Sequence, residues 1–132
     1  MRRFEYLDDY LIKDDDTIQR IASKYYLKWW LYPAIHHENL NVLGDNPYAP
    51  SQGKVVKIPY LNTSEILHTV VKGDIWQSLA EEYYGSPVLF PHIAVSNESR
   101  LLAIGAQIKI PPLVTKRDIM TAKELRNALS RS

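Results

Sequence analysis

The sequence contains no cysteine, and none of its apolar runs approaches the roughly 20 residues that a membrane-spanning helix needs. The lack of cysteine excludes disulfide bonds and thiolate metal ligands. The sequence also has no large excess of either sign of charge, because 16 basic residues nearly cancel 15 acidic ones. This balance argues against a general nucleic-acid or membrane-surface binder. Glu5, Asp8 and Asp9 occupy the place of the apolar region of a secretion signal, so we expect synthesis in a cytoplasm without a signal peptide.

Patterns that would indicate an enzyme or a metal site are missing as well. Of the four histidines, His36 and His37 are adjacent, and neighbouring side chains on a helix diverge by about 100°. The acidic run at residues 14–16 lacks the glycine and the distal glutamate of a calcium loop, and we interpret Asp16 as a helix cap. The sequence has no phosphate loop and no nucleophile motif. We therefore expect no catalysis, no metal and no cofactor.

Large rings are abundant by contrast: nine tyrosines and three tryptophans accompany only two phenylalanines. Tyrosine and tryptophan combine an apolar body with a polar tip, which suits protein interfaces, but small domains also fill their cores with such rings. Both interpretations stay open. Trp29 and Trp30 are consecutive, so at least one of them should be partly exposed.

Residues 66–112 predict a complete small domain. The β-branched run 66–71 favours a strand, and Asp74 is a plausible N-cap that Gln77 could complete as a capping box. Apolar residues at helical spacing follow, and the run 85–87 ends this helix and begins another. Residues 108–110 predict a closing strand that ends at Pro111. The predicted order is strand, helix, helix, strand.

An earlier segment repeats this pattern. Tyr25 aligns with Tyr83 at an offset of 83 − 25 = 58 residues. Tyr26 aligns with Tyr84 in the same ungapped register, and the further identities there include Asp16 with Asp74, Gln19 with Gln77, Ala22 with Ala80, Pro33 with Pro91, Ile35 with Ile93, and Asn39 with Asn97. We therefore predict an α+β protein with two tandem domains at residues 4–59 and 65–112, a linker at 60–64 and a basic helical tail at 113–132. The first domain has the longer loop, at 40–53.

The residues of the second copy resemble a LysM domain. The resemblance rests on the run 70–74, the run 78–80, Asn97 and the run 105–111, and it covers the whole domain in the right order. The runs 83–87 and 90–93 resemble the subtype found in tail and baseplate proteins of phages and related contractile particles. The resemblance implies two βααβ domains that bind rather than hydrolyse.

The resemblance also implies a groove for peptidoglycan or chitin between the loop after the first strand and the loop before the closing strand. The candidate glycan-binding residues are Asp16, Thr17, Gln52 and Gly53 in the first copy, and Gly73, Asp74 and Gly105 in the second. Each copy departs from the family pattern. Ile75 replaces the usual threonine, and Asp15 replaces the usual glycine, which counts against sugar binding.

The C-terminal tail predicts an amphipathic helix over residues 115–129, capped by Thr115 or Thr121. A lone helix of this length is marginal in water, so it either folds back on the repeats or docks on another protein, and docking is the favoured expectation. The candidate interface residues are Trp29, Trp30, Tyr48, Ile119, Leu125, Arg126 and Leu129.

These observations lead to one expected function and two alternatives. By resemblance we expect a structural adaptor in the tail baseplate of a contractile phage or phage-like particle, located in the virion, with other tail and baseplate proteins as partners. The main alternative is a peptidoglycan-binding module that targets a partner to the cell wall. A spore or envelope structural protein is a third class. None of the three requires nucleic acid, a membrane or a cofactor.

Overall fold

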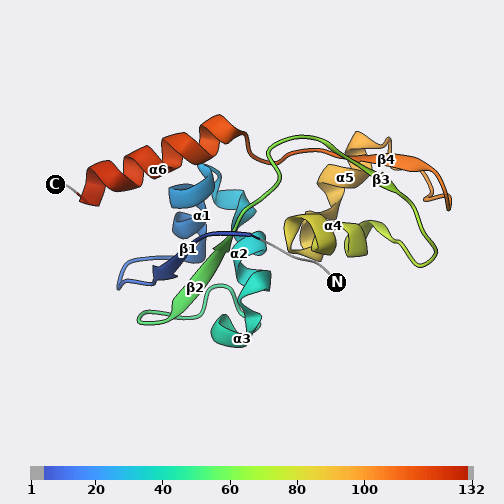
Figure 1. Cartoon of the computed structure of the whole chain (residues 1–132). Coiled ribbons are helices and arrows are strands. Elements are labelled where there is room, and N and C mark those ends of the chain that lie inside the picture. Colours follow the sequence, from blue (N-terminus) through green and yellow to red (C-terminus); the bar gives the residue numbers. More distant parts are fainter. Residues whose placement is uncertain (1–4, 131–132) are drawn as a thin grey trace.

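A computed structural model describes residues 5–130 and shows a mixed α+β protein (Figure 1). The elements are, in order, β1 (Tyr6–Leu11), α1 (Ile18–Tyr26), the 3-10 helix η1 (Trp29–Leu31), α2 (Tyr32–Glu38), α3 (Leu40–Leu43), β2 (Val55–Pro59), β3 (Ile66–Thr69), α4 (Trp76–Tyr84), the 3-10 helix η2 (Pro87–Leu89), α5 (Phe90–Ser96), β4 (Gln107–Ile110) and α6 (Lys116–Ser130). The predicted α+β class is confirmed.

The strands form two separate antiparallel pairs, β1 with β2 and β3 with β4. In the second pair, His68 lies opposite Ile108 and Leu67 opposite Lys109. Alternate residues of the closing strands point inward, so Ile58 and Ile110 are fully buried. We call β1 to β2 the first unit and β3 to β4 the second unit.

The helices of the two units begin at matching places. Ile18 opens α1 and Trp76 opens α4, and the positions of η1 with η2 and of α2 with α5 differ by the same offset of 76 − 18 = 58 residues. Leu27 and Gly85 end the first helices in the same left-handed conformation, with φ of 61° and 85°. The repeated pattern in the sequence therefore corresponds to a repeated order of elements.

Two repeated polar contacts tie the helices to the closing strands. The side-chain amide of Asn39 donates to the Ile35 and Lys57 carbonyls at 2.7 and 2.9 Å and accepts from the Lys57 amide at 2.9 Å. Asn97 makes the same three bonds to Ile93 and Lys109.

A tyrosine completes each attachment. The hydroxyl of Tyr26 donates to the Pro59 carbonyl, and the hydroxyl of Tyr84 donates to the Pro111 carbonyl. Both rings are fully buried, and burial raises the pKa of Tyr26 well above its usual value. Each closing strand is therefore held by an asparagine at the end of one helix and a tyrosine at the end of the other.

The helix caps differ from the prediction. Thr17, not Asp16, caps α1 by accepting from the Arg20 amide at 3.1 Å. Ile75, not Asp74, occupies the N-cap of α4, and Ser78 in place of Gln77 accepts from its backbone amide. Asp16 and Asp74 each lie one residue before the N-cap. Their carboxylates instead accept hydrogen bonds from the amides of Lys13 and Val71, in the turn that precedes each helix.

The 40–53 loop, predicted without structure, contains the short helix α3.

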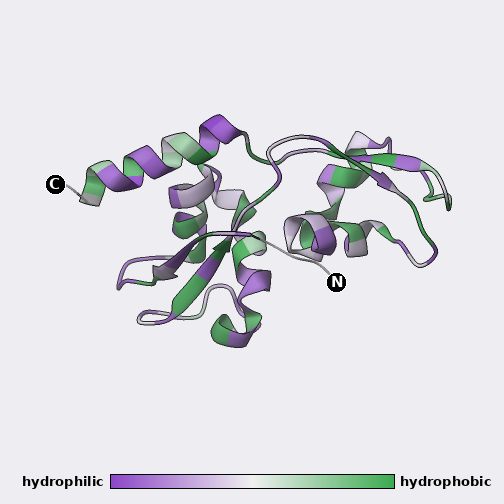
Figure 2. Ribbon diagram, in the orientation of Figure 1, coloured by the Kyte–Doolittle hydropathy of each residue, from purple (hydrophilic) through white to green (hydrophobic). Residues whose placement is uncertain are grey.

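Buried apolar residues of both units belong to one hydrophobic cluster. Leu61 lies in the predicted linker and is fully buried, and Leu113 and Val114, which precede α6, are buried as well. Figure 2 shows apolar residues concentrated on β2 and on the helices beside it, whereas α6 is largely hydrophilic. The connecting segments are therefore part of the core.

Helix α6 folds back along α1 of the first unit, on the far side of the molecule from the second sheet (Figure 1). Thr115 caps it: the Asp118 amide donates to the threonine hydroxyl, and the Thr115 amide donates to the Asp118 carboxylate, each at 3.0 Å. Asp118 also pairs with Lys28 at 2.9 Å. The tail helix was expected either to fold back on the repeats or to dock on another protein, and docking was favoured. Within this chain it folds back on α1.

Candidate functional site

A groove of about 360 Å³ opens in the first unit between the loop after β1 and the loop before β2. It is lined by Lys13, Asp14, Asp16, Thr17, Ile18, Gln19, Pro47, Tyr48, Ala49, Pro50, Ser51 and Gln52. The predicted residues Asp16, Thr17 and Gln52 are therefore brought together. The ring of Tyr48 is exposed at this groove, and its hydroxyl lies 3.3 Å from that of Tyr32.

Two polar side chains of this groove, those of Asp16 and Thr17, already have partners within the chain. Asp16 accepts from the Tyr10 hydroxyl at 2.7 Å and from the Lys13 amide at 2.9 Å, and it pairs with Lys24 at 2.9 Å. Burial alone would raise the pKa of Asp16, but these hydrogen bonds outweigh it and hold the pKa below its usual value. The Thr17 hydroxyl caps α1. The Asp16 carboxylate is therefore occupied within the chain, and the Thr17 hydroxyl already accepts one bond.

The predicted glycines act in turns. Gly53 and Gly105 have φ of 85° and 89°, a conformation that favours glycine. The Gly53 amide donates to the Ile12 carbonyl at 2.9 Å, and the Gly105 amide donates to the Val70 carbonyl at 2.8 Å. These bonds join the two loops at the end of each unit and leave neither amide available to a ligand.

In the second unit, Asp74 belongs to a closed polar cluster. Its carboxylate lies 2.8 Å from His68 Nε2 and accepts from the Val71 amide at 2.9 Å. The other imidazole nitrogen, Nδ1, lies 2.7 Å from the Tyr83 hydroxyl. Burial would raise the pKa of Asp74, but the bonds from His68 and Val71 outweigh it and lower the pKa. This cluster repeats that of Tyr10 and Asp16, with an imidazole in place of the phenol.

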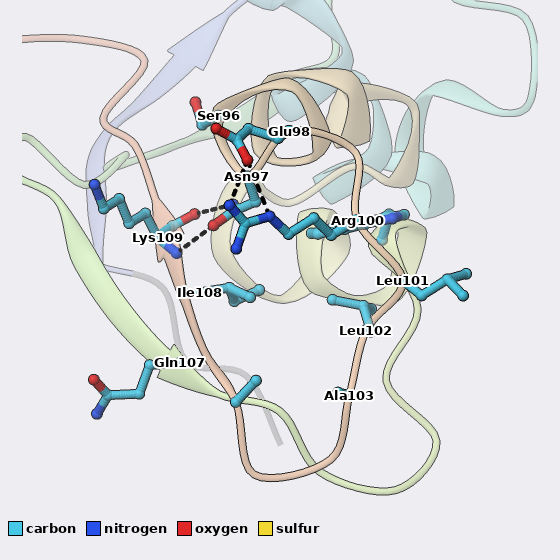
Figure 3. A pocket seen from close by; sticks show the side chains of 12 residues that line it. Ser96, Asn97, Glu98, Arg100, Leu101, Leu102, Ala103, Gln107, Ile108 and Lys109 are labelled. Atoms are coloured by element: carbon cyan, nitrogen blue, oxygen red, sulfur yellow. Dashed lines mark hydrogen bonds and ion pairs between the residues drawn. The ribbon is translucent and has the colours of Figure 1, made fainter.

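A cavity of about 340 Å³ lies in the second unit, but the predicted residues do not line it. Its walls are Trp76, Ser96, Asn97, Glu98, Arg100, Leu101, Leu102, Ala103, Ala106, Gln107, Ile108 and Lys109. Figure 3 shows Arg100 lying across this cavity, where its Nε donates to Glu98 at 3.0 Å beside the Asn97–Lys109 bonds. Gly73, Asp74 and Gly105 lie outside it. The expected second glycan groove is therefore not formed by those residues.

The corresponding end of the second unit carries aliphatic side chains instead. Val71, Ile75, Leu101 and Ile104 are 55, 55, 97 and 71% exposed. The bond from Gly105 to Val70 brings their two loops to one end of the molecule, at the right of Figure 1. We call these four residues the end patch. The matching positions of Val71 and Ile75 in the first unit are polar, Lys13 and Thr17.

Sequence reasoning found only part of this patch. The resemblance to LysM domains draws attention to Ile75 in the sequence. The exposure of Val71, Leu101 and Ile104 was not visible there, because apolar residues at the edges of predicted strands and loops fit a core equally well.

The predicted interface residues fall into two groups. Trp29, Tyr48, Leu125 and Leu129 have exposed side chains. The other three make contacts within the chain. The ring of Trp30 stacks on His92, and Ile119 packs on the core. The Arg126 guanidinium lies 3.9 Å from the centre of the Tyr25 ring and donates to the Lys24 carbonyl. Arg126 therefore fastens α6 to α1.

Within residues 5–130, no group of three histidine or acidic side chains could hold a metal ion, and no helix is long and apolar enough to cross a membrane. His36 and His37 diverge as expected. The Nε2 atom of His36 lies 2.8 Å from the Gly44 carbonyl, and that of His37 lies 3.2 Å from the Glu81 carboxylate.

Neither known family models nor curated proteins give a match to this sequence.

Proposed function

We propose that the chain is a structural adaptor in the tail baseplate of a contractile phage or phage-like injection particle. In this proposal the two units are LysM-like βααβ domains, and their surfaces hold neighbouring subunits. The proposal joins the resemblance of residues 70–111 to baseplate LysM domains with the repeated element order and the surfaces described above.

The end patch is the observation that carries the proposal. A glycan-binding LysM domain would need hydrogen-bonding groups where the second unit has four exposed aliphatic side chains. Exposed apolar residues gathered at one end of a small domain favour contact with another protein. The polar groups nearby, Asp74 and the Gly105 amide, are already bonded inside the unit.

Particle incorporation tests the proposal. We expect the wild-type chain, supplied to a producer strain that lacks its gene, to be recovered in purified tail particles. An Ile75→Asp/Ile104→Asp variant should be lost from them, because an interface cannot easily bury two carboxylates without partners.

The matched control for that experiment is Leu67→Asp. Leu67 is an exposed aliphatic residue of the same unit, and an aspartate there would face Lys109 across the strand pair. The control should enter particles normally. Incorporation of the end-patch variant at the wild-type level, or absence of the wild-type chain from particles, would refute the proposal.

Peptidoglycan binding is the second candidate function, and the groove of the first unit favours it. The exposed Tyr48 ring could stack on a sugar, with Gln52 in the same wall. Retention of the chain on purified peptidoglycan, lost in Tyr48→Ala and unchanged in Ile75→Asp/Ile104→Asp, would support this function over the adaptor.

A further inference from the structure

The two units differ in the segment that follows their second helices. In the first unit Asn39 leads directly into α3, and Leu43 of α3 is 7% exposed and belongs to the hydrophobic core. The offset of 58 residues places Leu101 at the position of Leu43, and Leu101 is 97% exposed. The second unit therefore lacks the buried leucine that the first unit has after its second helix.

The length of the connection to the closing strand accounts for this difference. From the asparagine to the proline at the end of the closing strand, the first unit has 59 − 39 = 20 residues and the second has 111 − 97 = 14. With the shorter connection the chain turns at once, and Glu98 and Ser99 adopt left-handed φ angles of 60° and 53°. These angles are unfavourable for residues other than glycine, so the surrounding contacts hold the turn. One of them is the bond from the Ser99 amide to the Ala94 carbonyl at 2.6 Å.

Beside this turn lies the cavity of about 340 Å³ described above, with Trp76 and Ile108 among its apolar walls. The counterpart of Trp76 in the first unit is Ile18, which is buried in the same core as the leucine of α3, whereas Trp76 is only half-buried. Figure 3 shows Leu102 directed toward the cavity and Leu101 directed away from it. The volume lies within the range of pockets that hold ligands, roughly 300–1,000 Å³.

The charged side chains at this end of the second unit favour an acidic ligand. Arg100 lies across the cavity and binds Glu98, but both side chains of this pair are exposed, and exposed pairs contribute little stability (Figure 3). Within residues 5–130 the Nη1 atom of Arg100 makes no hydrogen bond. Lys72 lies next to Val71 of the end patch and has no ion pair among the same residues. A carboxylate therefore has two cationic groups available here.

We propose that the cavity of the second unit receives a leucine side chain from a neighbouring protein, in a segment whose flanking acidic residues bind Arg100 and Lys72. The inference rests on the proposed adaptor function, because Leu101 belongs both to the end patch and to the wall of the cavity. It names the kind of segment that the end patch holds. The incoming leucine supplies the apolar cover that the first unit obtains from Leu43, and its acidic neighbour replaces Glu98 at the guanidinium.

A peptide titration of the isotope-labelled full chain tests this inference without any particle. The probe is the synthetic peptide Gly-Gly-Asp-Leu-Glu-Gly-Gly, and the readout is the NMR signal of the Trp76 indole and of the Leu102 methyl groups. We expect both signals to shift and to saturate. A peptide with alanine in place of leucine should bind at least about tenfold more weakly, because it buries fewer carbon atoms. Unchanged signals, or equal binding of the two peptides, overturns the proposal.

Variants of the chain locate the binding site. Ala103→Phe should abolish the peptide shifts by filling the cavity, and its thermal unfolding should match the wild type because Ala103 is exposed. Arg100→Gln should weaken peptide binding by roughly two- to fivefold, as expected for an exposed ion pair. The matched control, Arg117→Gln at an exposed position of α6, should bind like the wild type. Unchanged binding by Ala103→Phe contradicts the cavity as the site.

Particle incorporation separates this inference from the adaptor proposal itself. Loss of Ala103→Phe from particles, together with loss of Ile75→Asp/Ile104→Asp, supports both. If only the end-patch variant is lost, the adaptor function stands and the leucine site falls. If the peptide binds in the cavity but the wild-type chain is absent from particles, the leucine site stands and the adaptor function falls.

Discussion

At the scale of single residues, the side chains of Asn39 and Asn97 form the backbone hydrogen bonds that a neighbouring strand would otherwise make with β2 and β4. Each amide group bonds both backbone polar groups of a lysine in the closing strand, Lys57 or Lys109, and also the carbonyl at the end of its own helix. A two-stranded sheet leaves such groups unpaired at its edge, and a buried unpaired group is costly. This need explains why asparagine occurs at the same place in both units.

Asn39→Ala should lower the free energy of unfolding by about 3 kcal/mol, because it leaves one buried and two partly buried backbone groups without their partner. Urea denaturation measures this loss. The exposed Asn41→Ala serves as control and should change stability by less than about 0.5 kcal/mol. Equal losses in the two variants would show that the bonds of Asn39 contribute nothing specific.

Leu27 and Gly85 occupy the same left-handed position with unequal strain. Gly85→Ala should destabilise the protein by about 1–2 kcal/mol, since φ of 85° disfavours a side chain. Leu27→Gly relieves that strain but adds backbone entropy to the unfolded state, so its stability should stay level or rise by up to about 1 kcal/mol. Thermal unfolding distinguishes the two. A loss larger than about 1 kcal/mol in Leu27→Gly would mean that its side chain packs more strongly than its exposure indicates.

Asp16 and Asp74 make stability depend on pH. Their bonds lower the pKa of each folded carboxyl, so each stabilises the fold fully above its unfolded pKa and loses this contribution as pH falls through the folded pKa. We expect the free energy of unfolding to decline below a pH of about 4. Urea titrations at a series of pH values should show a smaller decline in Asp16→Asn and Asp74→Asn. An unchanged slope in both variants would assign acid sensitivity to other groups.

At the scale of elements, α6 is held to α1 by a few polar contacts near its two ends and a narrow apolar seam. Asp118 both caps the helix and pairs with Lys28, and Arg126 covers the Tyr25 ring. Removal of residues 115–132 would uncover that ring, so we expect a truncated chain to be less stable than the full one.

Asp118→Ala should weaken the attachment of α6 by about 1–2 kcal/mol, through the lost cap and the lost ion pair. Hydrogen exchange should then speed up in the amides of α6 while those of α4 and α5 stay protected. Glu124→Ala, at an exposed position of the same helix, should leave exchange unchanged. Uniformly faster exchange would instead mean that α6 unfolds only together with the core.

The sequence predicted the strands, the main helices and their repeat, because these depend on periodicity and on local turn chemistry. It missed the caps, since Asp16 and Thr17 are both good capping residues and only the path of the backbone selects one. It also missed where α6 packs. The apolar face of α6 was visible in the sequence, but no local signal says which surface such a face covers. For the same reason the end patch could not be distinguished from core residues.

At the scale of the whole molecule, the two units, the buried connecting segments and α6 form one packed body with apolar surfaces that lie apart in the chain. The end patch lies on the loops of the second unit, and the groove with Tyr48 lies on the first unit. An adaptor needs several such surfaces, whereas a simple glycan binder needs only a groove.

The central claim is that this chain works as a fixed part of a contractile particle. Quantitative mass spectrometry of particles purified on a density gradient tests it most directly. The account predicts that the chain sediments with the tail sheath and tube proteins at a constant ratio across the particle fractions. Recovery of the chain in the cell-wall fraction, with none in the particles, would contradict it.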